Sequence, residues 1–240
     1  MLYKIFPSLL FLLMTYSSGP FNFSNSEKIA PTKIASVAKS SFDMKVELVY
    51  NSLQANEFTL PNLESFTQAL KGFYLLKEKG LVQKDILTLV DFSLSSNVKR
   101  LWVIDLATNT ILLQSLVAHG RNTGEEFASK FSNSPQSFES SLGFYATGEV
   151  YKGKHGLSLK LDGLEKGIND HARERAVVVH GADYVSESFI RGNKRLGRSQ
   201  GCPAIPEALA NTIINLIKDK SCLFIYHPSM NFENTAKLIS

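Results

Sequence analysis

The sequence predicts a mainly β domain preceded by a small helical part. From residue 85 onward, short apolar runs rich in Val, Ile and Phe recur between Gly, Pro and polar residues, as strands do. Before residue 80, apolar residues instead recur at helical spacing. The chain has 240 residues, 44% of them hydrophobic, so it is long enough for one such domain and an appendage.

Residues 1–19 have the pattern of a signal peptide. Lys4 gives a charged start, residues 5–14 are mostly apolar, and residues 17–19 are small. An uncleaved anchor is the alternative. Residues 20–41 lack periodicity and indicate a linker. Export to the periplasm or cell envelope is therefore expected, with no stable membrane insertion after the signal is removed.

Two helices are expected in an appendage over residues 42–82. Apolar residues follow helical spacing over 44–53 and 63–79, with Pro61 near the second start and Gly80 after its end. Apolar stripes of this kind usually pack into a core, and a partner-binding hairpin is the alternative.

The β domain is expected over residues 85–230, with a tail at 231–240. Its predicted strands are 85–93, 99–106, 111–118, 142–151, 157–161, 176–179 and 221–226. Within the second, Trp102 and Ile104 alternate with Val103 and Asp105, which places the two pairs on opposite faces. A helix is predicted over 207–218, and the Ser-rich segment 127–141 is expected to be a surface loop or the wall of a cleft.

A histidine and a cysteine stand where nucleophilic chemistry could use both. His180 follows the short strand 176–179, and Cys202 precedes the helix that Pro206 introduces. A thiol attacks as thiolate, and its pKa falls near a helix N-terminus, an imidazolium or cationic side chains. Gly201 lets the backbone turn sharply, so that a substrate carbonyl can reach the neighbouring amides. The pattern favours acyl transfer.

Other interpretations of these residues stay open. A disulfide between Cys202 and Cys222 would make the first cysteine structural, although Cys222 lies in an apolar run and is expected to be buried. His155 also precedes a glycine and competes with His180 as the base. Neither an H-E-x-x-H motif nor paired-cysteine spacing is present, so no metal site is expected.

His180-Gly181 followed by Ser199-x-Gly201-Cys202 resembles the L,D-transpeptidase catalytic domain (YkuD-like) family. The resemblance extends through 141–145, 153–156 and 167–170, and covers about residues 98–227. The chain is similar to the divergent murein L,D-transpeptidase branch, in which Cys is followed by Pro-Ala. This implies a β-sandwich catalytic domain without a cofactor.

The resemblance also implies roles for individual residues. The catalytic set would be Cys202 as nucleophile and His180 as base, with Gly181, Ser199 and Gly201 around them. The substrate-binding candidates are Arg198, His155, Asp183, Gln200 and Tyr184. The Gly181 carbonyl or Asp183 is expected to orient His180.

The sequence departs from the commoner family pattern at two positions. That pattern is S-H-G-C followed by an apolar residue and an arginine, whereas this chain has Gln200 for the histidine and Ala204 for the arginine. The family's carboxylate-binding arginine is therefore missing. Among the basic residues before the motif, Arg198 is the nearest replacement, with Arg191, Lys194 and Arg195 farther away.

The implied function is that of a peptidoglycan L,D-transpeptidase or L,D-carboxypeptidase that cleaves tetrapeptide stems after their third residue. A cysteine-dependent amidase or endopeptidase is an alternative, although in papain-like enzymes the cysteine normally precedes the histidine. A non-catalytic peptidoglycan-binding module is another. The net charge of +4 and the lack of a nucleic-acid-binding fingerprint argue against a nucleic acid partner.

Overall fold

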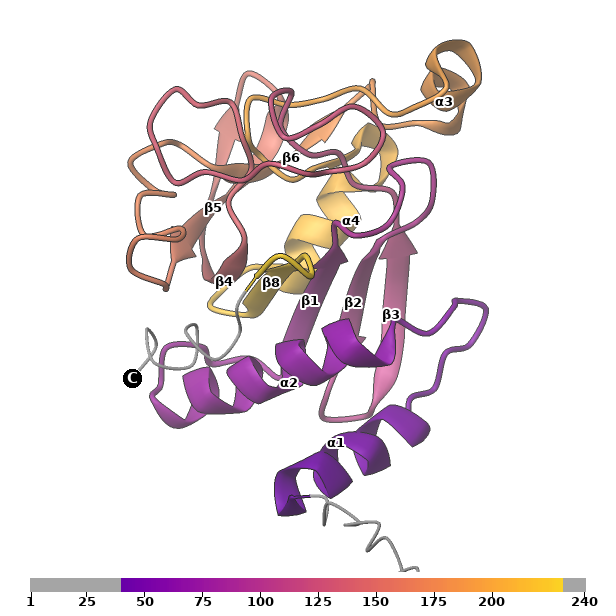
Figure 1. Cartoon of the computed structure of the whole chain (residues 1–240), viewed down its shortest axis with the longest axis vertical. Helices are drawn as coiled ribbons and strands as arrows, with labels where there is room; N and C mark the ends of the chain where they lie inside the picture. Colours follow the sequence, from indigo (N-terminus) through magenta and orange to yellow (C-terminus); the bar gives the residue numbers. More distant parts are fainter. Residues whose placement is uncertain (1–39, 231–240) are drawn as a thin grey trace, which may run out of the picture. The chain divides into compact units, whose positions relative to one another are not determined.

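The structure is a computed structural model that describes residues 40–230. The predicted signal peptide, nearly all of the predicted linker and the 231–240 tail lie outside the described residues. The elements, in chain order, are α1 (Ser41–Asn51), α2 (Leu63–Glu78), β1 (Ile86–Asp91), β2 (Leu101–Asp105), β3 (Thr110–Ser115), β4 (Gly143–Gly153), β5 (Gly156–Gly163), β6 (Val178–Ala182), α3 (Glu187–Asn193), β7 (Ala204–Pro206), α4 (Glu207–Ile217) and β8 (Cys222–Tyr226) (Figure 1).

The strands form one eight-stranded sheet in the order β3-β2-β1-β8-β4-β5-β6-β7. The pairs β1–β8 and β6–β7 are parallel, and the other pairs are antiparallel. An isolated bridge joins Ala118, just after β3, to Ala204 on β7, so the two ends of the sheet approach each other. The mainly β fold with a small helical N-terminal part is thus confirmed, and the expected sandwich arises from one continuous sheet that curves back on itself.

Two apolar cores lie on the two faces of this sheet. Helix α4 packs against β1, β2, β5 and β6, and its buried residues share one cluster with Val103. Helix α2 packs against β1 and β8, in a second cluster that contains Trp102 and Ile104. The alternation predicted along β2 is therefore confirmed. Burial of apolar surface on both faces supplies the main stabilisation, at about 25 cal/mol per Å².

The helices begin where local side chains satisfy their first amides. Ser40 and Asp43 form a capping box at α1, and Asn62 accepts the N–H of Glu64 at α2. Both helices belong to the same compact unit as the strands. Gly72 allows α2 to approach the sheet, because a Cβ there would lie 1.9 Å from the ring of Phe144.

Two expectations about the elements were wrong. Strand β6 runs from Val178 to Ala182, so His180 lies inside it and not at its end. Strand β7 stands between Cys202 and α4, so the cysteine is not directly ahead of the helix. Helix α3 and β7 were not predicted, since both are short and the segment is rich in charge and glycine.

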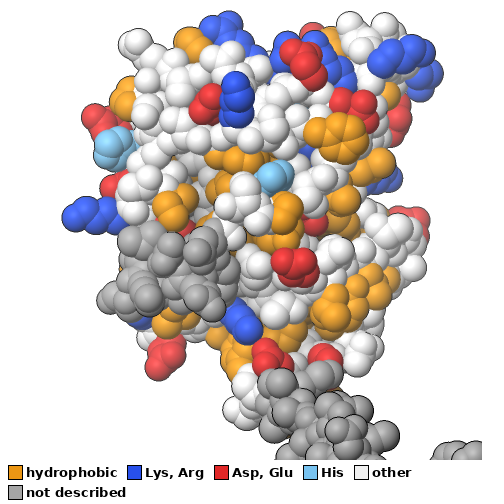
Figure 2. All heavy atoms as spheres, viewed as in Figure 1, with side chains coloured by type: hydrophobic (Ala, Val, Ile, Leu, Met, Phe, Trp, Pro, Cys, Tyr) orange, Lys and Arg blue, Asp and Glu red, His pale blue; other side chains and the backbone are white. Residues whose placement is uncertain are grey.

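The described surface is mixed in charge. Figure 2 shows Lys and Arg side chains interspersed with Asp and Glu over the face in view. Over residues 40–230, no helix is long and apolar enough to cross a bilayer.

Candidate active site

A cleft of about 560 Å³ lies beside the end of the β4–β5 hairpin and the turn that carries Cys202. It brings together seven of the predicted site residues, which are Cys202, His180, Ser199, Arg198, His155, Gln200 and Tyr184. It is also lined by Gln136 and Phe138. The segment 127–141 therefore contributes a wall of the cleft, which was one of its two predicted roles.

Cys202 is held against the backbone that leads into β6. Its sulfur accepts the N–H of Val178 at 3.5 Å, and its S–H points to the carbonyl of Ala176 at 3.8 Å. Burial raises the pKa of the thiol, while the Val178 N–H and the charge of Arg175 act in the opposite direction. The expected lowering of this pKa is therefore wrong, because the cost of desolvating the thiolate is larger than the stabilisation by its neighbours.

Ser199 and Gly201 shape the turn that presents the sulfur. The Ser199 hydroxyl donates to the carbonyl of Cys202 at 2.6 Å and accepts the N–H of Gly201 at 3.0 Å. Gly201 has φ of +120°, a backbone conformation that side chains with a Cβ rarely adopt. Ser199 therefore fixes the turn, and Gly201 permits it.

The imidazole of His180 is oriented by the backbone. Its Nδ1 lies 2.9 Å from the carbonyl oxygen of Gly181, which can only accept, so Nδ1 carries the proton and Nε2 the lone pair. Burial lowers the pKa of His180, and the nearby charges of His155 and Lys154 lower it further. At neutral pH the ring is therefore uncharged and able to accept a proton.

His155 is on the tip of the β4–β5 hairpin and covers the ring of His180. The two ring centroids are 4.6 Å apart, with 29° between the planes. His155 itself is exposed. The His155-Gly156 dipeptide thus lies next to His180-Gly181, and the exposed ring of His155 is placed to contact both a substrate and His180.

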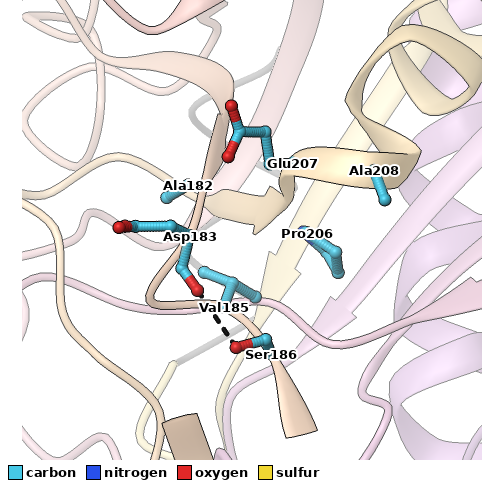
Figure 3. A pocket seen from close by; sticks show the side chains of 7 residues that line it. All are labelled: Ala182, Asp183, Val185, Ser186, Pro206, Glu207 and Ala208. Atoms are coloured by element: carbon cyan, nitrogen blue, oxygen red, sulfur yellow. Dashed lines mark hydrogen bonds between the residues drawn. The ribbon is translucent and has the colours of Figure 1, made fainter. Parts of the chain in front are cut away.

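Asp183 lies away from this cleft. It lines a separate hollow of about 430 Å³ near the start of α4, together with Pro206 and Glu207 (Figure 3). Its backbone carbonyl accepts from the Ser186 hydroxyl at 3.0 Å. Of the two groups expected to orient His180, the structure places the Gly181 carbonyl on Nδ1 and puts the Asp183 side chain in the other hollow.

Gly181 has a packing role as well. A Cβ at this position would lie 3.0 Å from the Cβ of Ala210 and 3.1 Å from the Cα of Glu207, so only glycine lets α4 approach β6 this closely. The strand therefore turns His180 toward the cleft and the next residue toward the helix, as alternation along a strand requires.

Arg198 lines the cleft but is paired with an acid. Its Nη1 donates to Glu125 at 2.6 Å and to the carbonyls of Arg121 and Gly124. Arg195 binds the same carboxylate at 2.9 Å. A substrate carboxylate would compete with Glu125 for the Arg198 guanidinium.

Ala204, which stands where the commoner pattern has arginine, is fully buried. It pairs with His180 across β6 and β7, exchanges backbone hydrogen bonds with Ala118, and packs among Leu116 and Leu196. An arginine here would place its charge in an apolar cluster.

Sequence reasoning missed Arg175. Its guanidinium lines the cleft and favours the thiolate of Cys202. Arg175 lies just ahead of a predicted strand, but nothing in its local sequence indicates that it faces a cysteine far along the chain.

Both cysteines are free thiols, and Cys222 is completely buried in β8. The alternative of a disulfide with Cys202 is therefore wrong. In the described part of the chain, no three His, Cys, Asp or Glu side chains are grouped as metal ligands would be.

Residues 59–226 match the family model of the L,D-transpeptidase catalytic domain. The match covers more than half of the sequence, so the chain belongs to the L,D-transpeptidase catalytic domain family, as its motifs indicated. No curated protein matches the sequence significantly.

Several solved structures are similar to this chain. An L,D-transpeptidase from Mycobacterium smegmatis is 11% identical, with a TM-score of 0.37 over 60% of this chain and 59% of the other. An L,D-transpeptidase from Xylanimonas cellulosilytica is 12% identical, with a TM-score of 0.34 over 60% and 61%. The helical cell shape determining protein Pgp2 from Campylobacter jejuni is 11% identical, with a TM-score of 0.40 over 67% and 56%. The chain spans less than two thirds of the length of each.

Proposed function

We propose that the protein is a peptidoglycan L,D-transpeptidase or L,D-carboxypeptidase that acts on tetrapeptide stems through a thioester on Cys202. The observation that carries this proposal is that Cys202 and His180 line one cleft, in a chain that belongs to the L,D-transpeptidase catalytic domain family. An exported protein in the periplasm or cell envelope would meet this substrate.

The resting site holds a neutral thiol and a neutral imidazole. The pKa of Cys202 is raised and that of His180 is lowered, so an ion pair between them is not the stable state before substrate binds. Proton transfer from sulfur to Nε2 of His180 accompanies the attack on the peptide carbonyl. The S–C bond forms, the C–N bond breaks, and the proton on Nε2 passes to the leaving amine.

The acyl group then leaves the sulfur. An acceptor amine attacks the thioester to give a cross-link, or water attacks to give a free carboxylate. In either case His180 takes a proton from the attacking group and returns it to the thiolate, which restores the resting site.

The oxyanion donor is the Cys202 N–H. Both the Gly201 and Cys202 amides were candidates, but the Gly201 N–H already donates to the Ser199 hydroxyl. The Ser140 hydroxyl donates to the carbonyl of Gly201, which belongs to the same planar peptide unit as the Cys202 N–H, so this amide has a fixed orientation.

The remaining residues of the cleft act on the substrate. His155, Tyr184 and Gln200 line the path of the stem peptide, and Arg198 is the candidate for its carboxylate, in exchange with Glu125. Asp183 would take part only if the substrate extends to the second hollow.

Mass spectrometry of the products formed from purified muropeptides tests this function. We expect loss of the fourth stem residue or formation of a cross-link at the third, and neither product with the Cys202→Ala variant. Cleavage between sugar and stem would indicate an amidase, and binding without any product would indicate a non-catalytic module. Either result contradicts the proposal.

A further inference from the structure

The guanidinium of Arg175 is held by hydrogen bonds to the Ser-rich segment 127–141, and these bonds are called the clasp below. Its Nη1 donates to the carbonyl of Ser132 at 2.8 Å and to the hydroxyl of Ser141. Its Nη2 donates to the carbonyl of Glu139 at 2.7 Å and to the hydroxyl of Ser137 at 3.2 Å. These four hydrogen bonds engage the four terminal N–H groups, so the position of the guanidinium is fixed.

The same segment holds the turn before the nucleophile. The Ser140 hydroxyl donates to the carbonyl of Gly201 at 3.1 Å. The carbonyl oxygen of Glu139 lies 2.9 Å, and Nη2 of Arg175 lies 3.5 Å, from the place that a Cβ on Gly201 would occupy. Arg175, the Ser-rich segment and the turn at Gly201 are therefore one set of contacts.

Other cationic groups near the motif are placed differently. Arg191 and Lys194 are exposed on and after α3, and Arg195 and Arg198 bind Glu125. The other titratable groups facing the cleft are His180, His155, Lys154, Tyr151 and Tyr184. Of the described cations, Arg175 is the one whose charge favours the Cys202 thiolate, so it offsets part of the cost of burying that thiolate.

We infer that Arg175 is a positioning residue that locks the Ser-rich segment to the Cys202 turn and supplies the positive charge beside the sulfur that Ala204 cannot. The inference rests on the proposed function of Cys202 as nucleophile. Because its four terminal N–H groups are engaged, Arg175 acts as a fixed charge and does not form a forked pair with a substrate carboxylate. Arg175 therefore supplies a positive charge in place of the arginine that the commoner family pattern has, but it does not take over that arginine's binding of a carboxylate.

The test is the rate of iodoacetamide alkylation of Cys202 against pH, followed by mass spectrometry of the labelled peptide. We expect Arg175→Gln to move the alkylation profile to higher pH by about one unit, since one opposite charge is removed. Arg175→Lys keeps a charge but loses part of the clasp, and its shift should be smaller. Arg195→Gln, which removes a nearby charge outside the cleft, is the matched control and should leave the profile unchanged.

The fold of each variant is checked separately by thermal unfolding and by limited proteolysis of residues 127–141. If Arg175→Gln does not fold, Arg175→Lys decides the outcome through proteolysis, because it loses hydrogen bonds to residues 127–141 and wild-type resistance of that segment would overturn the inference. This assay needs no peptidoglycan substrate. A shifted profile in a protein without turnover would contradict the proposed function and leave the role of Arg175 standing, whereas turnover with an unshifted profile would do the reverse.

Discussion

The ring of His155 stacks on the ring of His180, with centroids 4.6 Å apart, although His155 lies in the turn between β4 and β5 and His180 lies in β6. His155 is exposed and His180 is buried, so the first shields the second from solvent. Its burial and the nearby charges of His155 and Lys154 all lower the pKa of His180.

Replacing these two histidines should have different consequences. We expect His180→Ala to slow acylation by about 10² to 10⁴, the range typical of general-base assistance. His155→Ala should lose less, and should move the acid limb of kcat/KM to higher pH, because uncovering His180 and removing a nearby charge both raise its pKa. His155→Phe keeps the stacking and should shift the limb less. A larger rate loss for His155→Ala than for His180→Ala would mean that His155, and not His180, is the general base.

The resting thiol predicts a simple pH dependence for the wild type. Burial raises the pKa of the Cys202 thiol above its ordinary value, so alkylation by iodoacetamide should rise steeply only in alkaline solution. A plateau of fast alkylation near neutral pH would instead show a thiolate–imidazolium pair in the resting enzyme, which contradicts the proposed order of proton transfer.

The two cysteines should separate activity from stability. Cys202→Ala should abolish turnover and leave the unfolding free energy almost unchanged, because its side chain is only partly buried. Cys222→Ala should keep turnover but lose about 1 kcal/mol of stability, since it removes a fully buried group from β8. Urea unfolding and muropeptide turnover measure the two quantities, and equal loss of turnover in both variants would be the contrary result.

Introducing the arginine of the commoner family pattern at position 204 should lower the stability of the fold. Ala204→Arg would bury an unpaired charge among apolar side chains, at a cost of about 3 kcal/mol or more. Ala208→Arg, on the exposed face of α4, is the matched control and should be nearly neutral. Urea unfolding of both variants provides the comparison, and equal stabilities would mean that β7 is not packed as described.

Acid should destabilise the fold through His119. Its Nδ1 accepts from the buried guanidinium of Arg100 at 2.9 Å, and burial beside that cation, with a smaller contribution from Arg198, lowers its pKa to about 4. The unfolded chain takes up this proton near pH 6.5 and the folded chain does not. Stability present above pH 6.5 is thus lost as the pH falls toward about 4, by roughly 3 kcal/mol in total.

The variant that checks this loss is His119→Gln, whose side-chain oxygen can still accept from Arg100. The fall in its unfolding free energy from pH 7 to pH 5 should be smaller than in wild type. His171→Gln alters an exposed histidine and should keep the wild-type slope. If the unfolding free energy fell equally from pH 7 to pH 5 in all three proteins, His119 would not be the cause of the acid destabilisation.

The parts of the fold that sequence predicted are those with a local cause. Strands and long helices follow from apolar periodicity, and the Cys–His pair follows from a motif. Which residues lie close together in the fold does not follow from local sequence. Asp183 is close to His180 in sequence, yet it lines the other hollow. Arg175 was missed for the same reason, because its partners lie in a segment about forty residues earlier and in the turn at Cys202.

The direction of the thiol pKa also required the structure. Sequence suggested cationic neighbours and a helix start, both of which lower the pKa. It could not show that β7 separates Cys202 from α4, or that the cost of desolvating the thiolate is larger than its stabilisation by neighbouring groups.

The central claim is that Cys202 carries the acyl group. Intact-protein mass spectrometry after brief mixing with a tetrapeptide-stem muropeptide tests it most directly. The account predicts a mass increase equal to the mass of the muropeptide minus that of the free amino acid released from its fourth position, located on Cys202 by peptide mapping and released by hydroxylamine. An enzyme that turns over the muropeptide while Cys202 stays unmodified under these conditions, or after its replacement by alanine, would contradict it.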